Sequence, residues 1–480
     1  MAICDTRSAA QYLGARTSFG LDPIRTFIAT SLLFGSLTIA AAPPLRGPDE
    51  TAHFLRAYGV AAGDIVPSIR DAQGRMGIFL PPRLYAGFNY FEDVRIKEKG
   101  LEWKGYAPVF QAYFSRQPTN PGADPIFVLY AGSEGYSPVA YLPQVAAGII
   151  ARALDLDFLA TSYLMRFAGL IVLTAAIAYA ISIVPQLAWA LVAIAMLPAA
   201  LYGRSVINPG GAALAAAMVV SALWLRGSML SHTQITGRQS FWMMLNALTK
   251  PPNLAFILLE LLGTPPTTRR WYRILATLPA IVVALLWIAC SGADTAVWRM
   301  VEITGQEAVA FDPTFKIHYL LHHPLHFPAA VIASLEEKNL GELWRQLIGV
   351  LGLFDTTLQS WAYPTLTALL LGTFLTTLRT DSGARRRIAI AAGMTALTYA
   401  VGLYLICYLV FTPHDADSVW GVQGRYFVPV LPLLAIVLTA IANRGAGERF
   451  RALLAISGAV LSGSASLHAI LEIDWNFGPQ

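Results

Sequence analysis

The chain has 480 residues, of which 55% are hydrophobic and only 13% are charged. A soluble domain carries roughly 25% charged residues, so this composition excludes an ordinary soluble enzyme and predicts an all-α polytopic membrane protein. The net charge of +5 is small for this length, and the basic residues fall in short loops between apolar runs, which indicates topology signals and no nucleic-acid partner.

The first apolar run covers residues 26–42 and follows Arg7, Arg16 and Arg25. Its small residues at the end are typical of a signal peptide, but the run is longer than a usual signal core, so we favour an uncleaved first span. The preceding arginines predict that residues 1–25 form a cytoplasmic N-terminus, because basic residues favour that side of a membrane.

A long polar segment, residues 43–135, is rich in Gly, Pro and aromatic residues and is too polar to lie in lipid. It predicts an extracytoplasmic loop with short interfacial helices. The next run, residues 136–154, either crosses the membrane or lies in its outer interface. If it crosses, the loop with Arg226 and Arg238 falls outside. If it is interfacial, that loop and every later arginine cluster fall inside, so we adopt the interfacial helix.

The later apolar runs complete a bundle with two long extracytoplasmic loops, the second at residues 291–360. That second loop contains an amphipathic stretch near 335–351. Counting two short crossings around Lys250, we expect about eleven transmembrane helices and a tail at 472–480. The expected spans after the first are 163–184, 187–202, 210–225, the pair broken at 250–252, 271–290, 361–378, 388–411, 426–442 and 453–471.

Polar residues of this arrangement gather on its outer side, whereas the spans are nearly free of ionisable groups. Asp49, Glu50 and His53 directly follow the first span, and such a group can act as a general base or hold a divalent metal. The alternative is a capped helix end, because acidic residues suit a first turn. The shortage of charged residues near the middle of the spans disfavours an ion-coupled carrier.

Three cations on the outer side, Arg166, Lys250 and Arg425, are candidates for binding a phosphate. An ordinary snorkelling arginine explains Arg166 equally well. The aromatic residues Tyr136 and Tyr141 either anchor a helix at headgroup level or form a wall for a polyprenyl chain or sugar ring.

These motifs together resemble one family. The bacterial membrane-protein group catalogued as domain of unknown function twenty-one forty-two is similar over nearly the whole chain, and its layout is similar to that of the GT-C glycosyltransferases, which include protein O-mannosyltransferases and the lipid A aminoarabinose transferase. The similar pieces are Pro48-Asp49-Glu50 with His53, Tyr136-Ser137-Pro138, Tyr141-Leu142-Pro143-Gln144, Arg166, Ser205 to Pro209 with Asn208, Lys250-Pro251-Pro252, and Gln423-Gly424-Arg425-Tyr426.

The resemblance implies a GT-C-like catalytic module at residues 26–290, followed after the second loop by C-terminal transmembrane helices at 361–471. It implies an inverting transfer of a sugar from a polyprenyl-phosphate carrier to a cell-surface glycan or lipid acceptor. The reaction would take place at the periplasmic face of the bacterial inner membrane, among membrane lipids. In that family layout, Asp49 is the catalytic or metal-binding carboxylate.

One departure from the family pattern bears on the metal. Similar sequences carry a second acidic residue where this chain has Gly210. This favours Asp49 as a base without a metal, although a divalent metal at Asp49 stays open. The missing acid also leaves a second function open, that of a non-catalytic subunit or transporter in surface-polysaccharide assembly or export.

Overall fold

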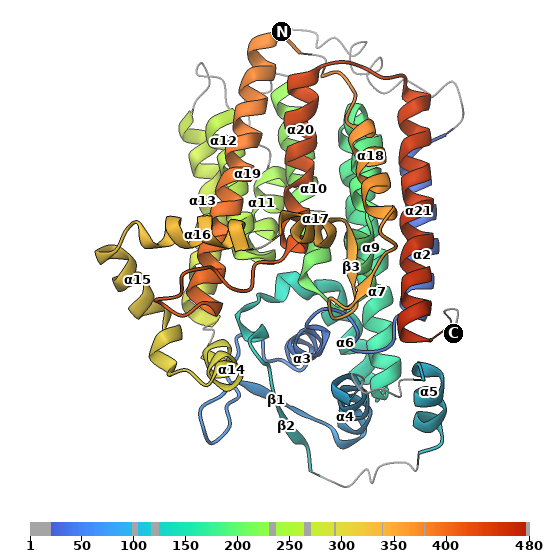
Figure 1. Ribbon diagram of the computed structural model, residues 1–480, viewed down its shortest axis with the longest axis vertical. Helices are drawn as coiled ribbons and strands as arrows, with labels where there is room; N and C mark the ends of the chain where they lie inside the picture. The colour runs from blue at the N-terminus through green and yellow to red at the C-terminus, as the bar shows by residue number, and fades with distance from the viewer. Residues whose placement is uncertain are drawn as a thin grey trace.

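The computed structural model describes residues 21–97, 104–116, 124–229, 237–263, 270–291, 294–337, 339–378 and 380–476. The described chain is mostly helical, with two small antiparallel β-ribbons (Figure 1). Most of the expected N-terminal segment and the end of the expected tail lie outside the described residues.

Long apolar helices form the body of the molecule and run along its long axis (Figure 1). Their outward surfaces carry large apolar side chains such as Leu33, Ile171 and Leu397, and so many exposed apolar groups suit lipid as solvent. Six described helices are long and apolar enough to cross a membrane: α2 (Pro23–Ala41), α7 (Phe158–Ile183), α10 (Pro209–Met229), α19 (Ser382–Phe411), η6 with α20 (Gly424–Ala442) and α21 (Glu448–Asp474).

The span expected at 187–202 is a bent helix pair and not one straight helix. Helix α8 (Ala188–Ala195) and helix α9 (Pro198–Ser205) meet at 72°, and as one span they would be the seventh. Pro198 explains the break, since proline lacks an N–H and disfavours helical backbone before it. The buried guanidinium of Arg204 donates to the carbonyls of Ala195 at 2.8 Å and Ala200 at 3.1 Å, which satisfies backbone acceptors beside the bend.

Several other expected spans are short, so the structure does not confirm eleven transmembrane helices. The run expected at 361–378 contains α18 (Ala362–Thr373), and its 12 residues extend only ~18 Å against a ~30 Å hydrocarbon core. The hairpin around Lys250 consists of α11 (Gly237–Thr249), η4 (Pro251–Phe256) and α12 (Ile257–Gly263), and α13 (Arg270–Ser291) follows it.

One end of the bundle carries the first polar insertion, and we call it the α3 end. Its helices pack around an aromatic core in which the ring of Phe54 lies 5.1 Å from that of Phe158. Helix α6 has only 12 residues and is not among the helices long enough to cross, as expected for an interfacial helix. The elements are α3 (Glu50–Ala61), β1 (Gly77–Leu80) paired with β2 (Ile126–Leu129), α4 (Pro82–Lys97), α5 (Tyr106–Phe114), η1 (Ser133–Gly135), η2 (Pro138–Tyr141) and α6 (Leu142–Ala153).

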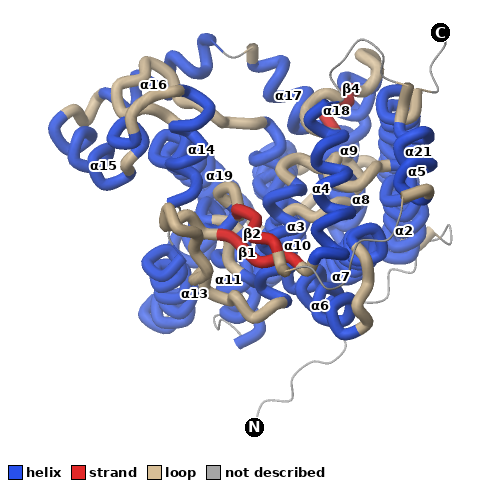
Figure 2. The backbone as a smooth tube through the Cα atoms, turned by 90° about the horizontal axis from the view of Figure 1, so that it is seen from below, coloured by secondary structure: helices blue, strands red, loops and turns tan. Residues whose placement is uncertain are grey.

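The second polar insertion lies beside the first when the molecule is viewed from below (Figure 2). The amphipathic stretch expected near 335–351 forms a helix, α17, which packs against η6. The elements are α14 (Asp294–Thr304), η5 (Ala308–Phe311), α15 (Pro313–His322), α16 (His326–Glu337), α17 (Leu340–Gly349), β3 (Val350–Leu351) and β4 (Thr356–Thr357).

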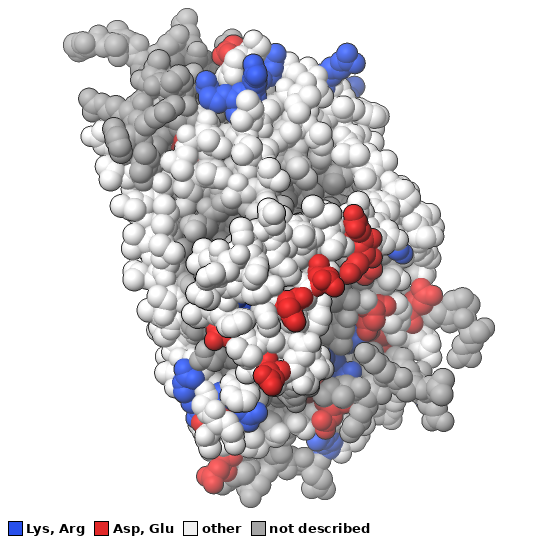
Figure 3. Space-filling view, turned by 60° about the vertical axis from the view of Figure 1, so that its left-hand side comes forward, with Lys and Arg blue, Asp and Glu red and all other residues white. Residues whose placement is uncertain are grey.

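Basic side chains gather at the end of the bundle opposite the α3 end, which we call the arginine end (Figure 3). Helices α10, α12, α18 and α20 run toward that end, where α2 begins (Figure 1). A broad belt with few charges separates it from the lower part of the molecule, where acidic and basic side chains are mixed (Figure 3).

Candidate active site at the start of α3

The loop between α2 and α3 holds Asp49 in an unusual backbone conformation. Asp49 has φ 56° and lies in the left-handed region, which aspartate tolerates better than most residues. Although Asp49 precedes the first residue of α3, its side chain makes no capping hydrogen bond to the helix. The helix-cap alternative therefore does not describe this carboxylate, which points elsewhere.

Two arginines from distant parts of the chain face Asp49. The Arg425 guanidinium donates to its carboxylate at 3.1 Å, and Arg299 of α14 lies 3.9 Å away. Burial alone would raise the pKa of Asp49, but the positive charges of these arginines outweigh it and hold the pKa below the usual 3.8. The carboxylate is therefore ionised at neutral pH, and its side chain keeps 40% of its surface exposed.

Close packing of η6 against α17 positions Arg425. A Cβ atom on Gly424 would lie 1.9 Å from the carbonyl oxygen of Leu343, so only glycine fits this contact. The side chain of Gln423 accepts a hydrogen bond from Nε of Arg425 at 2.8 Å, and the guanidinium lies 4.6 Å from the ring centroid of Phe354. These contacts orient the guanidinium toward Asp49.

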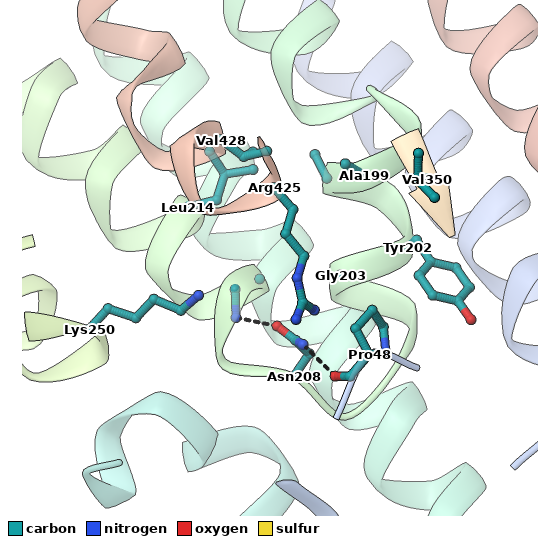
Figure 4. Close-up of a pocket in the computed structure, with 13 residues that line it drawn as sticks. Pro48, Ala199, Tyr202, Gly203, Asn208, Leu214, Lys250, Val350, Arg425 and Val428 are labelled. Carbon is teal, nitrogen blue, oxygen red and sulfur yellow. Dashed lines mark hydrogen bonds between the residues drawn. The ribbon is translucent and has the colours of Figure 1, made fainter. Parts of the chain in front are cut away.

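A cavity opens beside Arg425 and extends to Lys250 (Figure 4). It has about 500 Å³ of empty space, including its open mouth. The Lys250 ammonium lies 4.8 Å from the ring centroid of Tyr426, and within the described part of the chain no hydrogen bond is recorded for it. The lining residues are Pro48, Ala199, Ala200, Tyr202, Gly203, Asn208, Gly210, Gly211, Leu214, Lys250, Val350, Arg425 and Val428.

Asn208 joins the Asp49 loop to the start of α10 (Figure 4). Its amide nitrogen donates to the carbonyl of Pro48 at 3.2 Å, and its side-chain oxygen accepts from the backbone N–H of Gly210 at 2.6 Å. A side chain at position 210 would place its Cβ 2.7 Å from that oxygen. An acid at this position would therefore displace Asn208.

His53 forms a buried cluster with two tyrosines next to Asp49. The ring nitrogen Nδ1 of His53 lies 2.7 Å from the hydroxyl of Tyr141, and the ring of Tyr136 meets the imidazole edge-on at 5.3 Å. Burial lowers the pKa of His53 to about 3 and raises the pKa of both tyrosines. All three side chains are therefore neutral at physiological pH, and His53 is close enough to Asp49 for the two to interact electrostatically.

Glu50 and Arg166 form a separate, fully buried ion pair. Arg166 donates to both Glu50 oxygens, at 2.8 and 2.6 Å, and also to two backbone carbonyls just after α2. Glu50 in addition accepts from the backbone N–H groups of Gly47 and Ile207, at 2.8 and 2.9 Å. With this many protein partners, the pair fixes the Asp49 loop to α7, and neither side chain faces the cavity.

Arg46 is a further buried cation in the same loop. Its guanidinium pairs with Asp355 of the β3–β4 turn at 3.0 Å and with Asp474, the last residue of α21, at 2.7 Å.

The sequence pattern predicted neither Arg46 nor Arg299 as a site residue, because a single arginine in a polar insertion has no distinguishing pattern. Of the expected site residues, the structure brings together Asp49, His53, Tyr136, Tyr141, Asn208, Lys250, Gln423, Arg425 and Tyr426.

These residues all fall within one family match. A family model described as "Predicted membrane protein (DUF2142)" matches residues 32–434. The chain belongs to this family. Comparison with curated proteins and with solved structures found no match. The family description states that its members are membrane proteins, in agreement with the apolar helices, and specifies no activity.

The donor set around Asp49 does not fit a divalent metal. Among the described residues, no group of three or more His, Cys, Asp or Glu side chains stands together as metal ligands. Arg425 and Arg299 both lie within 4 Å of the carboxylate, and their charges repel a second cation. This arrangement instead suits an anion held next to a base.

Proposed function

We propose that this protein is an inverting glycosyltransferase that moves a sugar from a polyprenyl-phosphate carrier to a hydroxyl of a cell-surface glycan or lipid. One observation carries the proposal. An ionised carboxylate, Asp49, accepts a hydrogen bond at 3.1 Å from Arg425, and Arg425 lines a cavity together with Lys250 and several apolar side chains. A base therefore lies next to a cavity that offers basic groups for an anion and an apolar lining.

The cavity matches the two parts of a lipid-phosphate donor. Arg425 supplies positive charge for the phosphate, and its planar fork suits phosphate oxygens. Burial and the charge of Arg425 lower the pKa of Lys250 to about 7, and a bound phosphate would favour its charged form. Leu214, Val350 and Val428 line the same cavity and offer an apolar path for the first isoprene units. The cavity therefore offers a basic surface to the phosphate and an apolar surface to the lipid chain.

The chemistry then follows from the placement of charge. Asp49 takes the proton of the acceptor hydroxyl, the acceptor oxygen bonds to the anomeric carbon, and the bond from that carbon to the phosphate oxygen breaks. The electron pair leaves with the polyprenyl phosphate, whose growing charge Lys250 and Arg425 stabilise. Attack opposite the leaving group inverts the anomeric configuration.

The contact between Asp49 and Arg425 links donor binding to the strength of the base. In the free protein the arginine lowers the pKa of Asp49 and makes it a poor proton acceptor. A phosphate on Arg425 offsets that positive charge, so the basicity of the carboxylate rises when the donor binds. We therefore expect the donor to bind before the acceptor is activated.

The charge distribution supports a periplasmic site. Asp49 lies at the α3 end, and basic side chains gather at the opposite arginine end (Figure 3). Since basic loops favour the cytoplasm, the α3 end faces away from it, which in a bacterial inner membrane is the periplasm. Lipid-linked sugars used for surface glycans are presented on that face.

The test is sugar transfer by purified protein supplied with a polyprenyl-phosphate sugar and an acceptor extract. Loss of a general base costs about 10²- to 10⁴-fold in rate, so Asp49→Asn should fall by at least that lower bound. Asp124→Asn, which changes an exposed carboxylate at the same end, is the matched control. Wild-type transfer by Asp49→Asn would refute the assignment.

The second candidate, a non-catalytic subunit or transporter in polysaccharide export, is favoured by one observation. Gly210 and Asn208 stand in the segment where the resemblance described above leads us to expect a second acid. Surface glycans of a deletion strain, compared by mass spectrometry, separate the two functions. Absence of one sugar supports the transferase, whereas absence of the whole polymer supports export.

A further inference from the structure

A second cavity lies at the other end of α3. Tyr58 lines it, nine residues after Asp49, which places it roughly 13 Å further along the helix. The cavity has about 500 Å³ of empty space including its mouth, and α3, α4, α6 and α7 meet there. The lining residues are Tyr58, Pro81, Arg83, Leu84, Ala151, Arg152, Asp155, Leu156 and Thr161.

The polar groups of this cavity suit a single negative charge. Arg83 contacts the carboxylate of Asp155 at 3.3 Å, whereas the guanidinium of Arg152 lies 5.6 Å from the ring centroid of Tyr58 and has no carboxylate within ion-pair distance among the described residues. Two arginines and one aspartate leave a net charge of +1.

A buried hydroxyl gives an independent indication of a ligand. The side chain of Thr161 is only 1% exposed, and no hydrogen bond is found for its Oγ1 within the described ranges. Burying a hydroxyl without a partner costs about 1–3 kcal/mol, so such groups normally have one. An anionic oxygen in the cavity would supply this missing acceptor.

The cavity lies at the expected level of lipid headgroups. Helix α7 has 26 residues and extends ~39 Å, more than the ~30 Å hydrocarbon core, so its first turn with Thr161 reaches the polar interface. Next to the cavity, α6 exposes Ile149 and Ile150 by 54% and 52%, and Leu154, the residue after the helix, is 65% exposed. Side chains of this kind suit acyl chains and not water.

We propose that this cavity binds the phosphodiester headgroup of an anionic phospholipid, with the acyl chains along the exposed face of α6. The net charge of +1 balances the single negative charge of a phosphodiester. The apolar strip on α6 favours a lipid over the other anionic occupant of suitable size, an acidic saccharide. The site is independent of the Asp49 cavity, so a lipid bound here would hold α6 against α3 and α7 whether or not the protein transfers sugar.

The test uses the full-length protein in detergent, mixed with phosphatidylglycerol or with phosphatidylcholine of the same chains. Native mass spectrometry counts the retained lipid, and thermal unfolding measures the stabilisation. We expect retention and stabilisation with phosphatidylglycerol only, and at least fivefold less retained lipid in Arg152→Gln. Thr161→Val is the second variant, and Arg116→Gln, an exposed arginine at the same end, is the matched control.

Defined outcomes overturn the proposal. Equal retention of both lipids would show that the headgroup charge is not recognised. Unchanged binding in both Arg152→Gln and Thr161→Val would place the lipid elsewhere. Equal stabilisation by inorganic phosphate would show that a free anion suffices, and displacement of phosphatidylglycerol by a hexuronic acid oligosaccharide would identify a saccharide site.

Discussion

The buried pair of Glu50 and Arg166 allows a sharp test, because its neighbours in sequence and space belong to the proposed site while the pair itself does not. In Glu50→Ala, Arg166 loses a carboxylate bonded at 2.8 and 2.6 Å, and the backbone N–H groups of Gly47 and Ile207 lose their acceptor. Breaking a buried ion pair costs about 3–5 kcal/mol, and each unpaired N–H adds about 1–3 kcal/mol. The loss is thus about 5 kcal/mol or more, comparable to the total stability of many proteins.

The assay is unfolding of the purified protein in detergent by heat and by denaturant. Glu50→Ala and Arg166→Met should each unfold far more easily than Glu307→Ala, which removes an exposed carboxylate of the second insertion. The double variant should lose less stability than the two single variants lose in sum. Each single change leaves one buried charge without its partner, whereas the double change removes both charges. We expect a coupling energy of about 2–3 kcal/mol.

The reasoning fails if either single variant keeps wild-type stability. If such a variant also loses sugar transfer, Glu50 or Arg166 acts on the substrate and not on the fold. Additive single effects would likewise show that the two side chains do not stabilise each other.

Three further predictions concern the Asp49 site. Gly424→Ala should weaken transfer at least tenfold and cost about 1–3 kcal/mol in the free energy of unfolding, because the added methyl group displaces η6 and with it Arg425. Arg299→Gln removes a positive charge 3.9 Å from Asp49, so the acid limb of the rate profile should move to higher pH, measured as initial rate between pH 3 and 6. The pKa of buried His53 is about 3, whereas in the unfolded chain it is 6.5. Between these two values the unfolded chain binds one more proton than the folded protein does. The contribution of neutral His53 to stability is therefore present above pH 6.5 and is lost as the pH falls from 6.5 to 3. Acid titration of the unfolding free energy should therefore be less steep in His53→Gln than in the wild type, and no rate transition from His53 should appear between pH 5 and 8.

Span length and composition were enough to predict the long helices, because an uninterrupted apolar run in lipid can satisfy its backbone hydrogen bonds in few ways other than a helix. The run at 361–378 shows where this fails. Helix α18 ends at Thr373, and beyond it the backbone finds other partners: the Leu375 carbonyl accepts from Ala446, and the Leu378 N–H donates to the Asn443 side chain. Hydrogen bonds to the loop after α20 replace those of a helix, and apolar content alone does not indicate this.

The two adjacent acids, Asp49 and Glu50, show the corresponding limit at the site. Both lie in the same motif, and on sequence only the family resemblance distinguished Asp49 from Glu50. The left-handed backbone at Asp49 separates them, since it directs Asp49 to Arg425 while Glu50, the first residue of α3, turns inward to Arg166. Arg425 could be anticipated from its glycine-containing motif, whereas Arg299 depends on how α14 folds back and had no local signal.

The ion pair between Arg46 and Asp474 also has a consequence for biogenesis. Arg46 lies directly after the first span, and its buried partner is the last residue of the final span. A nascent chain that has released only its early helices from the ribosome holds this loop to α7 through Glu50 and Arg166, but it has neither Asp355 nor Asp474 to neutralise Arg46. Completion of the last helix therefore joins the end of the final span to the loop after the first, and chains truncated before Asp474 should be less stable because Arg46 then lacks a buried partner.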